Sequence, residues 1–317
     1  MNTVKKLLLT TPRGFCAGVA RAVKAVEDTL EIFGAPVYVK HEIVHNKHVV
    51  AELSAKGVIT IENLTEAPEG AVVVFSAHGS IPEHYKEAEK RHIQLIDATC
   101  PLVTKVHLEV GRFLKEGYKI IYIGHRGHIE GIGVLGEAEA GLIPLVDTVS
   151  DVAALEIGNP EKLVYLTQTT LSIDDTAIVI DALKQKYPQI IAPPLSDICF
   201  ATTNRQEAVK ALAKVSDLVL ILGSKTSSNS TRLMETARRE GTEAYLIDDV
   251  TELDPKWLEK KAIVGVSAGA SAPEKLVQGV VEYFKTQGVI VEDFVVGSEK
   301  MQFAEPIELM QLKKKNI

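Results

Sequence analysis

Short runs of β-branched and aliphatic residues alternate along the chain with longer segments in which apolar residues recur every three or four positions. Short apolar runs are typical of buried strands, and the longer spacing is typical of helices that cover a sheet on one face. Strands that alternate with helices favour parallel sheets. The pattern therefore predicts an α/β fold built from parallel sheets with flanking helices.

The order of these segments repeats three times. In each repeat a cysteine precedes a helix, and a strand then ends in polar residues: 37–46 (VYVKHEIVHN), 119–128 (KIIYIGHRGH) and 218–229 (LVLILGSKTSSN). A helix and a second strand that runs into acidic or polar residues follow, at 58–63, 143–148 and 244–250. A third strand ends in small polar residues: 72–80 (VVVFSAHGS), 163–172 (LVYLTQTTLS) and 263–273 (IVGVSAGASAP). Another helix follows, and short segments at 95–100 and 190–199 lead to the next cysteine.

Three repeats of roughly 100 residues are what a triplicated α/β unit leaves in a sequence. We predict units at 16–99, 100–197 and 198–300, with an N-terminal strand at 5–13 in the sheet of the third unit. Residues 301–317, including Lys313, Lys314 and Lys315, read as a solvated C-terminal tail. Ligands of parallel sheets bind beyond the carboxyl ends of the strands, where the cysteines and polar clusters fall. Packing around a pseudo-threefold axis would turn these ends to one central cleft.

The composition and charge of the chain disfavour several kinds of partner. The chain has 317 residues, is 46% hydrophobic, and carries a net charge of −7, so a nucleic-acid or anionic-membrane partner is not favoured. The N-terminal segment is too short for a signal-peptide core, and no apolar run approaches the length of a membrane span. We expect a cytoplasmic protein. Three cysteines in a reducing compartment do not suggest a disulfide framework.

The three cysteines are the first candidate for chemistry. Cys16, Cys100 and Cys199 occupy the same place in each repeat, directly before a helix, and a helix N-terminus stabilises the thiolate that ligates metal. An isolated cysteine is more often a buried, inert apolar residue, but equal placement argues for one shared site. Three thiolates suit zinc or an iron–sulfur cluster. Close C-x-x-C pairs, typical of zinc ribbons, are absent, and three ligands on a four-iron cubane would leave one iron open as a Lewis acid.

Polar side chains at the strand ends are candidates for anion binding, because imidazole, hydroxyl and amide groups beside glycine suit phosphate oxygens. A single histidine there is more often structural, but these occupy matching loops. The set comprises His45, His78, His125 and His128 in the first two repeats and Ser227, Ser228, Asn229 and Ser271 in the third.

Two further residues have possible catalytic roles. Glu130 follows His128 in a glycine-flanked loop, where an acid is usually solvated but could donate a proton if the loop closed over a metal. Thr169, with Gln168 and Thr170, caps the helix that begins near Ser172 or relays protons. The run 131–136 fits the dinucleotide fingerprint G-x-G-x-x-G, but the preceding strand ends near Gly124 and little room is left for the helix. We interpret it as a flexible loop without bound NAD.

Four strings resemble the 4-hydroxy-3-methylbut-2-enyl diphosphate reductases: 12–19 (PRGFCAGV), 97–107 (DATCPLVTKVH), 167–172 (TQTTLS) and 199–206 (CFATTNRQ). The resemblance runs from about residue 8 to 281, with the strings in the same order. It implies a trefoil of three α/β units around a [4Fe-4S] cluster held by Cys16, Cys100 and Cys199. It also implies that the substrate's allylic hydroxyl meets the open iron. The diphosphate-binding positions it implies are His45, His78, His128, Ser227, Ser228, Asn229 and Ser271.

The resemblance further implies that Glu130 is the proton donor and that Thr169 helps to orient the hydroxyl. Where the family loop commonly reads His-Pro-Glu-Val, this chain has Ile129 and Gly131 in place of the proline and valine, and Glu137 in place of a glutamine. Glu130 is retained, so we expect the chemistry to persist with altered stiffness of the loop.

The implied reaction is a two-electron reductive dehydroxylation to isopentenyl and dimethylallyl diphosphate, the last step of the methylerythritol phosphate route. No flavin or nicotinamide site is evident, so the electrons would come from a small redox protein such as ferredoxin or flavodoxin. Two alternatives stay open: a non-redox iron–sulfur dehydratase, and a cluster-bearing sensor or binding protein without turnover.

Overall fold

The computed structural model describes residues 4–315, with the side chains of 4–314. Met1, Asn2 and Thr3 of the short N-terminal segment and the last two residues of the predicted tail lie outside the described residues. The chain divides into two compact units. Unit 1 comprises residues up to Val19, His45–Ala51 and Phe200–Gln302, and unit 2 comprises Ala20–Val44, Glu52–Cys199 and the residues from Phe303 on.

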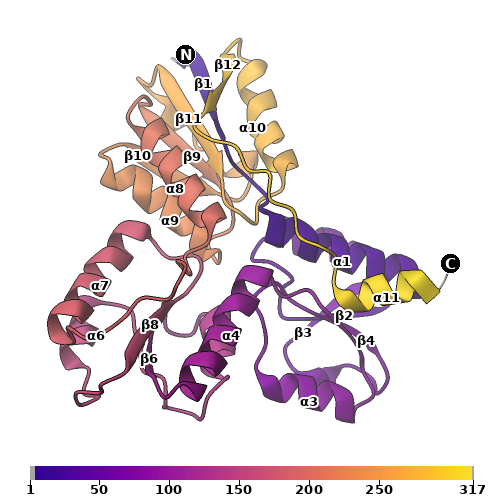
Figure 1. Ribbon diagram of the computed structural model, residues 1–317. Helices are drawn as coiled ribbons and strands as arrows, with labels where there is room; N and C mark the ends of the chain where they lie inside the picture. The colour runs from indigo at the N-terminus through magenta and orange to yellow at the C-terminus, as the bar shows by residue number, and fades with distance from the viewer. Residues whose placement is uncertain (1–3, 316–317) are drawn as a thin grey trace. The chain divides into compact units, whose positions relative to one another are not determined.

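Unit 1 contains one parallel sheet, ordered β10-β9-β11-β1-β12. Its strands are β1 (Lys6–Thr11), β9 (Leu218–Leu222), β10 (Glu243–Ile247), β11 (Ile263–Ala268) and β12 (Ile290–Val295). The indigo strand β1 runs among the orange strands of the C-terminal part in Figure 1. This confirms that the N-terminal strand joins the sheet of the third repeat, although the edge strand β12 was not predicted.

The sheet of unit 1 is covered on both faces. Leu8, Val219 and Ile221 pack with α8 (Phe200–Ala213) and α9 (Ser228–Arg239), whereas alternate residues of the same strands pack with α10 (Glu274–Lys285). Successive side chains of a strand point to opposite faces, so a strand between two helical layers must be apolar throughout. All five residues of β9 are accordingly buried. Short 3-10 helices at Val250–Glu252 and Pro255–Leu258 complete this unit.

Unit 2 contains two parallel sheets. The first is ordered β3-β2-β4-β5 and the second β7-β6-β8. The strands are β2 (Val37–Lys40), β3 (Val58–Ile61), β4 (Val72–Phe75), β5 (Gln94–Asp97), β6 (Lys119–Ile123), β7 (Leu145–Val146) and β8 (Leu163–Thr167). The fold is therefore α/β with three parallel-sheet units, as the repeat predicted. The segment before Cys199 differs from β5, because it forms only one bridge with the sheet, between Ile191 and Val164.

Several helices lie wholly within unit 2. They are α3 (Pro82–Lys90), α4 (Pro101–Lys115), α5 (Ile129–Leu135), α6 (Val149–Ala154), α7 (Ile173–Lys186) and α11 (Ile307–Lys315), with a 3-10 turn at Leu64–Glu66. Two helices cross from one unit to the other: α1 (Ala17–Phe33) and α2 (Lys47–Ala55). In α1 the buried Val19, Ala22 and Val26 recur every three or four positions, so one stripe of the helix is apolar.

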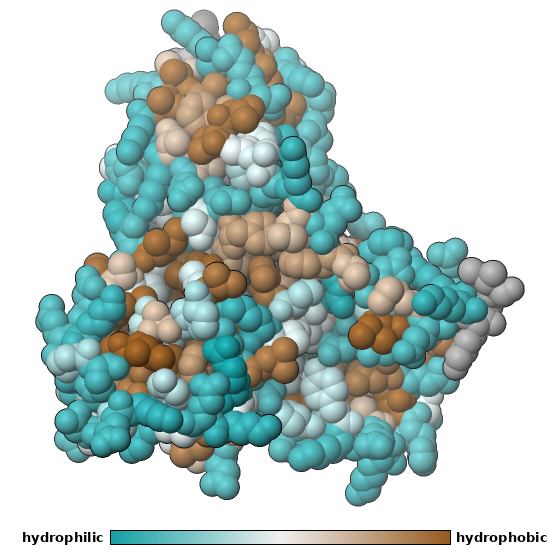
Figure 2. Space-filling model, viewed as in Figure 1, coloured by the Kyte–Doolittle hydropathy of each residue, from teal (hydrophilic) through white to brown (hydrophobic). Residues whose placement is uncertain are grey.

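Two interpretations from the sequence were wrong. The run 131–136 is not a flexible loop, because most of it belongs to helix α5. The C-terminal residues are not simply a solvated tail, because they form α11, whose Leu309 is fully buried. Lys313 Nζ lies 3.0 Å from Asp28 Oδ2 of α1, and the yellow α11 lies beside α1 in Figure 1. The face drawn in Figure 2 is largely hydrophilic, with hydrophobic residues in separate patches. Within residues 4–315, no helix has both the length and the apolar character that a membrane crossing requires.

Candidate active site

The backbone at the three cysteines repeats the same hydrogen bond. The amide N–H of Cys16 donates to the carbonyl of Ala270 at 3.1 Å, that of Cys100 to Ala77 at 3.0 Å, and that of Cys199 to Thr169 at 3.1 Å. Each acceptor lies two residues beyond the end of the third strand of a sheet: β11, β4 or β8. The equal placement seen in the sequence is thus an equal attachment in three dimensions.

Each cysteine also has the surroundings of a thiolate ligand. All three precede the first residue of a helix, α1, α4 or α8, and all three are partly exposed. The Val19 N–H points at Cys16 Sγ over 3.5 Å, as the N-terminal turn of a helix provides for a negative sulfur. Pro101 occupies the first turn of α4, where its missing N–H costs nothing. This donor chemistry fits a soft metal centre. Among the side chains of residues 4–314, no three His, Cys, Asp or Glu residues gather as metal ligands, so the shared site stays a prediction.

One group of predicted residues lies in unit 1, and we call it the donor region: His45, Ser227, Ser228, Asn229 and Ser271. Ser271 Oγ donates to the His45 carbonyl at 3.0 Å and lies 3.3 Å from Ser227 Oγ. The Asn229 side-chain oxygen accepts the Ala270 N–H at 2.8 Å, and Ala270 in turn accepts the Cys16 N–H. Ser227 caps α9 and Ser228 is its first residue. In the donor region Ser227, Asn229 and Ser271 are therefore buried, His45 and Ser228 are half-buried, and the set is tied to the cysteine loop.

The other group lies in unit 2, and we call it the acid region: His78, His128, Glu130 and Thr169. Glu130 is 2% exposed, and its carboxylate accepts hydrogen bonds from Thr169 Oγ1 at 2.8 Å and from the Thr169 N–H at 2.7 Å. His128 caps α5 by accepting the Glu130 N–H on Nδ1, which leaves the proton of a neutral ring on Nε2. The rings of His78 and His128 meet edge to face, with centroids 6.3 Å apart.

Glu130 is the one strongly perturbed acid in this region. Burial raises its pKa from the ordinary 4.5 to about 7, and the hydrogen bonds from Thr169 act in the opposite direction without cancelling the effect of burial. A carboxyl group with a pKa near neutrality exists in both forms at pH 7, which is the condition for efficient proton transfer. The residue lies in the first turn of a helix, not in a loop as the sequence suggested.

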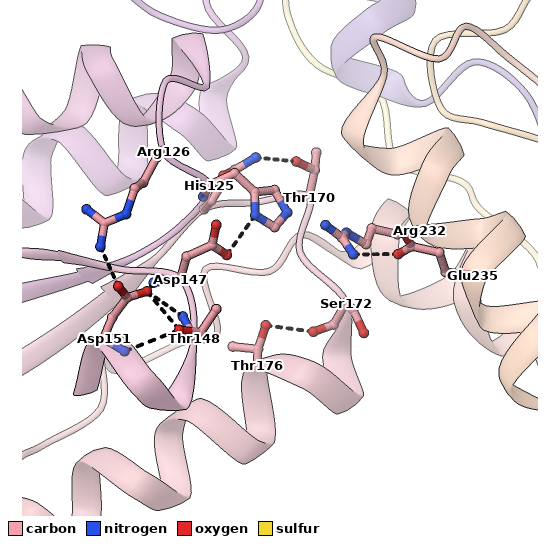
Figure 3. A network of polar contacts seen from close by, with 11 residues as sticks. His125, Arg126, Asp147, Thr148, Asp151, Thr170, Ser172, Thr176, Arg232 and Glu235 are labelled. Atoms are coloured by element: carbon pink, nitrogen blue, oxygen red, sulfur yellow. Dashed lines mark hydrogen bonds and ion pairs between the residues drawn. The ribbon is translucent and has the colours of Figure 1, made fainter. Parts of the chain in front are cut away.

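Two residues near the acid region, Ser172 and His125, have structural contacts. Ser172, not Thr169, caps α7 by accepting the Asp175 N–H, so the capping interpretation of Thr169 was wrong. His125 is turned to Asp147, with Nδ1 and Oδ1 2.9 Å apart, in the network of Figure 3. Its backbone N–H donates to Gln168 Oε1. His125 therefore holds the end of β6, whereas His128 belongs to the acid region.

The unusual residues of the α5 segment have local partners. Glu137, two residues after the end of α5, has its Oε1 2.7 Å from His107 Nδ1 on α4, so this carboxylate joins the turn after α5 to α4. A Cβ atom at Gly136 would come within 2.2 Å of Ile81 Cγ2, and one at Gly133 within 3.3 Å of His107. The glycines of the G-x-G-x-x-G run therefore allow close packing of α5, a role unrelated to a dinucleotide.

The sequence interpretation missed two charged groups that hold the cysteine loops. Arg205 is 1% exposed, pairs with Glu299 at 2.8 Å, and donates to the Gly14 carbonyl through Nε and Nη2, at 3.1 and 2.8 Å. Asp197 is buried two residues before Cys199 and pairs with Lys105 at 2.6 Å. The sequence did contain a sign of them: Lys105 and Arg205 lie within the strings 97–107 and 199–206, and Asp197 lies two residues before Cys199.

Comparison with known proteins identifies the family. A family model described as "LytB protein" matches residues 7–285. A 4-hydroxy-3-methylbut-2-enyl diphosphate reductase of Actinobacillus pleuropneumoniae is 54% identical over 307 residues, which cover 96% of this chain and 98% of that protein. The protein of the same name from Nitrosomonas europaea is 51% identical over 315 residues, which cover 95% of this chain and 98% of that protein.

A solved structure agrees with the sequence relatives. The E-1-hydroxy-2-methyl-but-2-enyl-4-diphosphate reductase of Plasmodium falciparum matches with a TM-score of 0.96 and 38% identity, covering 99% of each chain. The family resemblance found in the four strings is thereby confirmed over nearly the whole chain. The chain belongs to the LytB family and is an oxidoreductase.

Proposed function

We propose that the chain reduces (E)-4-hydroxy-3-methylbut-2-enyl diphosphate to isopentenyl and dimethylallyl diphosphate. The reaction consumes two electrons and two protons: the C–O bond breaks, the hydroxyl leaves as water with one proton, and the second proton adds to carbon. The names of the relatives support this substrate. The observation that carries the proposal is the buried, hydrogen-bonded Glu130, whose pKa of about 7 suits a proton donor.

The cofactor in this proposal is a [4Fe-4S] cluster held by Cys16, Cys100 and Cys199. When bound, it supplies the electrons and an iron that is not ligated by cysteine and acts as a Lewis acid. Support comes from the matching amide hydrogen bonds of the three cysteines and their places before α1, α4 and α8. The protein orients these thiolates through the backbone, since each cysteine N–H is fixed to the loop of a sheet.

Proton delivery is assigned to Glu130 and orientation of the hydroxyl to Thr169. The protonated carboxyl can release its proton to a departing hydroxyl, which would otherwise be a poor leaving group. Thr169 Oγ1 lies 2.8 Å from Glu130 Oε2, so a substrate hydroxyl that bonds to Thr169 would also be near the acid. His128 fixes the start of α5 and so the place of the Glu130 backbone.

The diphosphate would bind to neutral donors and imidazoles. In the donor region these are His45, Ser227, Ser228, Asn229 and Ser271, and in the acid region His78 and His128. Hydroxyl, amide and imidazole groups in buried loops suit an anion, because they donate hydrogen bonds without a competing negative charge. A small redox protein such as ferredoxin or flavodoxin would deliver the electrons, and the proposal places the reaction in the cytoplasm.

Anaerobic purification, counting of iron and sulfide, and an assay with the hydroxylated diphosphate and a reductant would test the proposal. We expect a brown protein that forms both products only when the reductant is present. Loss of water from the substrate without a reductant, giving a more unsaturated diphosphate in place of the two products, would indicate a dehydratase. Binding of the diphosphate without any conversion would indicate a sensor. A colourless, zinc-loaded protein would overturn the cofactor assignment.

A further inference from the structure

The segment before Cys199 is an interrupted edge strand. Its Ile191 N–H donates to the Leu163 carbonyl at 2.9 Å, and Tyr165 N–H donates back to Ile191 at 3.2 Å. Pro193 and Pro194 follow, and proline has no N–H with which to continue a ladder. In the first sheet the corresponding strand, β5, pairs regularly with β4 as far as Asp97, so Cys100 is approached along a complete ladder.

A carboxylate restores the interrupted ladder. Asp197 Oδ2 accepts the Thr167 N–H at 2.9 Å, at the end of β8, where a backbone carbonyl would stand in a regular sheet. Two residues later the Cys199 N–H donates to the Thr169 carbonyl at 3.1 Å. The side chain of Asp197 is fully buried, and a buried carboxylate is unfavourable unless it is paired and hydrogen-bonded.

The pairing partner is Lys105, on the helix that begins after Cys100. Its Nζ lies 2.6 Å from Asp197 Oδ1, 3.0 Å from the Leu195 carbonyl and 3.2 Å from Glu109 Oε2. The contacts with Asp197 and with the Leu195 carbonyl are hydrogen bonds, and the contact with Glu109 is an ion pair. The fixed ammonium thus joins α4 to the segment that leads to Cys199.

We propose that Lys105 and Asp197 are positioning residues that set the places of Cys100, Cys199 and Thr169 relative to one another. The proposal rests on the proposed function, in which both cysteines ligate a cluster and Thr169 orients the substrate. One ion pair, in which the Asp197 side chain is fully buried and that of Lys105 is 25% exposed, connects all three. Lys105 is five residues after Cys100, Asp197 is two residues before Cys199, and Asp197 Oδ2 accepts the N–H of Thr167, two residues before Thr169.

The variants D197N, K105M and K105R in the full-length chain test this role. Groups that orient metal ligands typically change metal affinity about 10–100-fold when removed. In anaerobically prepared holoenzyme, we expect D197N and K105M to lose iron to a ferrous chelator about tenfold faster and to change the electron paramagnetic resonance spectrum of the reduced cluster. K105R should recover most of both properties, because a guanidinium also pairs with a carboxylate.

A second measurement separates this proposal from the function itself. In full-length chain prepared without iron, modification of the three thiols by an alkylating reagent is followed residue by residue. We expect Cys199 and Cys100 to react about tenfold faster in D197N and K105M, whereas Cys16, whose loop is attached to Ala270 in unit 1, keeps its wild-type rate. This readout holds even if no cluster is bound and the functional proposal fails.

The matched control is K56M, which removes an ion pair of similar length, 2.7 Å to Glu27, between half-exposed side chains of unit 2. It should leave the iron-release rate, the spectrum and all thiol rates unchanged. Rates for Cys100 and Cys199 within twofold of wild type in both D197N and K105M would overturn the proposal, as would an equal acceleration of Cys16.

Discussion

The donor region and the acid region occupy equivalent places in the repeat but differ in chemistry. Both lie beyond the carboxyl ends of parallel strands, in loops and in the first turns of the helices that follow, and in both a loop carbonyl accepts a cysteine N–H. The donor region offers neutral hydroxyls and an amide, such as Ser271 and Asn229, bonded to one another and to backbone. The acid region places a carboxyl group, Glu130, out of water. A repeated backbone thus carries hydroxyl and amide groups in one copy and a buried carboxyl group in another.

Replacement of a cysteine attached to the loops of either region is expected to give the largest effect. Because the same backbone bond holds all three residues, Cys16→Ser in unit 1 and Cys100→Ser in unit 2 should both abolish the intact cluster, unless serine oxygen replaces sulfur as a ligand. Iron and sulfide per chain, counted after anaerobic purification, measure this. If Cys16→Ser retained the wild-type iron content, Cys16 would be removed from the ligand set and the two regions would not share a cofactor.

Glu130→Gln should lower kcat through the acid region and leave diphosphate binding by the donor region unchanged. The amide cannot donate a carboxyl proton, and loss of a general acid typically lowers kcat by about 10²–10⁴-fold. Iron content and the affinity for the diphosphate should stay near wild type, because the donor region is untouched. Glu137→Gln, which restores the glutamine common in the family, serves as the control and should change kcat little. Turnover of Glu130→Gln near the wild-type value would exclude Glu130 as the acid.

The same substitution should alter the pH dependence of stability. Because the folded state binds the Glu130 proton more tightly than the unfolded chain does, the free energy of unfolding falls as pH rises from about 4.5 through about 7. The raised pKa corresponds to roughly 3 kcal/mol lost over this window. Denaturant unfolding at pH 4 and pH 8 should show that loss in wild type relative to Glu130→Gln. Parallel curves for the two proteins would mean that Glu130 has an ordinary pKa.

An element could be predicted from the sequence where its own residues determine its structure, and not where contacts with distant segments do. Strand runs such as 218–222 are apolar throughout, so their burial and the three sheets could be read directly. Helix α5 could not, because glycine is a poor helix former and Gly131 and Gly133 lie within it, where Gly133 closely approaches His107 of a distant segment. Strand β12 was missed because its residues are mostly exposed and show no apolar alternation.

The candidate residues of the site were chosen from their residue types and positions, whereas the charged residues that support them were not found. Glu130 and Thr169 stood out as polar residues at strand ends, and the structure joins them by hydrogen bonds. The raised pKa of Glu130 depends on burial, which a single sequence does not reveal. Arg205 and Asp197 act on residues far away in the chain, Gly14 and Lys105. The sequence shows that a residue is charged but not which distant residue it contacts, so these pairs can be identified only from the fold.

A smaller effect is expected in the donor region. Ser271→Ala removes a hydroxyl that the proposal assigns to the diphosphate, and one lost hydrogen bond to a charged group is worth about 1.5–3 kcal/mol. KM should rise by about tenfold or more while kcat changes less than about threefold, because the acid is intact. Thr286→Ala, which removes an exposed hydroxyl bonded to the Tyr283 carbonyl in the same unit, is the control. A fall in kcat without a change in KM would place Ser271 with the acid region.

Ile129→Pro should give the smallest effect and concerns the stiffness of the acid region. Ile129 is the first residue of α5, a position that tolerates proline because its N–H has no partner within the helix. The preceding His128 has φ −69° and ψ 135°, the extended backbone that a following proline requires. Since proline restricts the unfolded chain, the free energy of unfolding should rise by about 0.4–1 kcal/mol. Denaturant unfolding measures this directly.

The same variant should leave the chemistry of the acid region unchanged. Neither the His128 cap nor the hydrogen bonds between Glu130 and Thr169 use the Ile129 N–H, so kcat and its pH dependence should match wild type. Ile178→Ala, at an exposed position on α7, controls for the loss of an apolar side chain. Destabilisation by Ile129→Pro would mean that the lost contacts of the half-buried isoleucine side chain outweigh the restriction of the unfolded chain by proline.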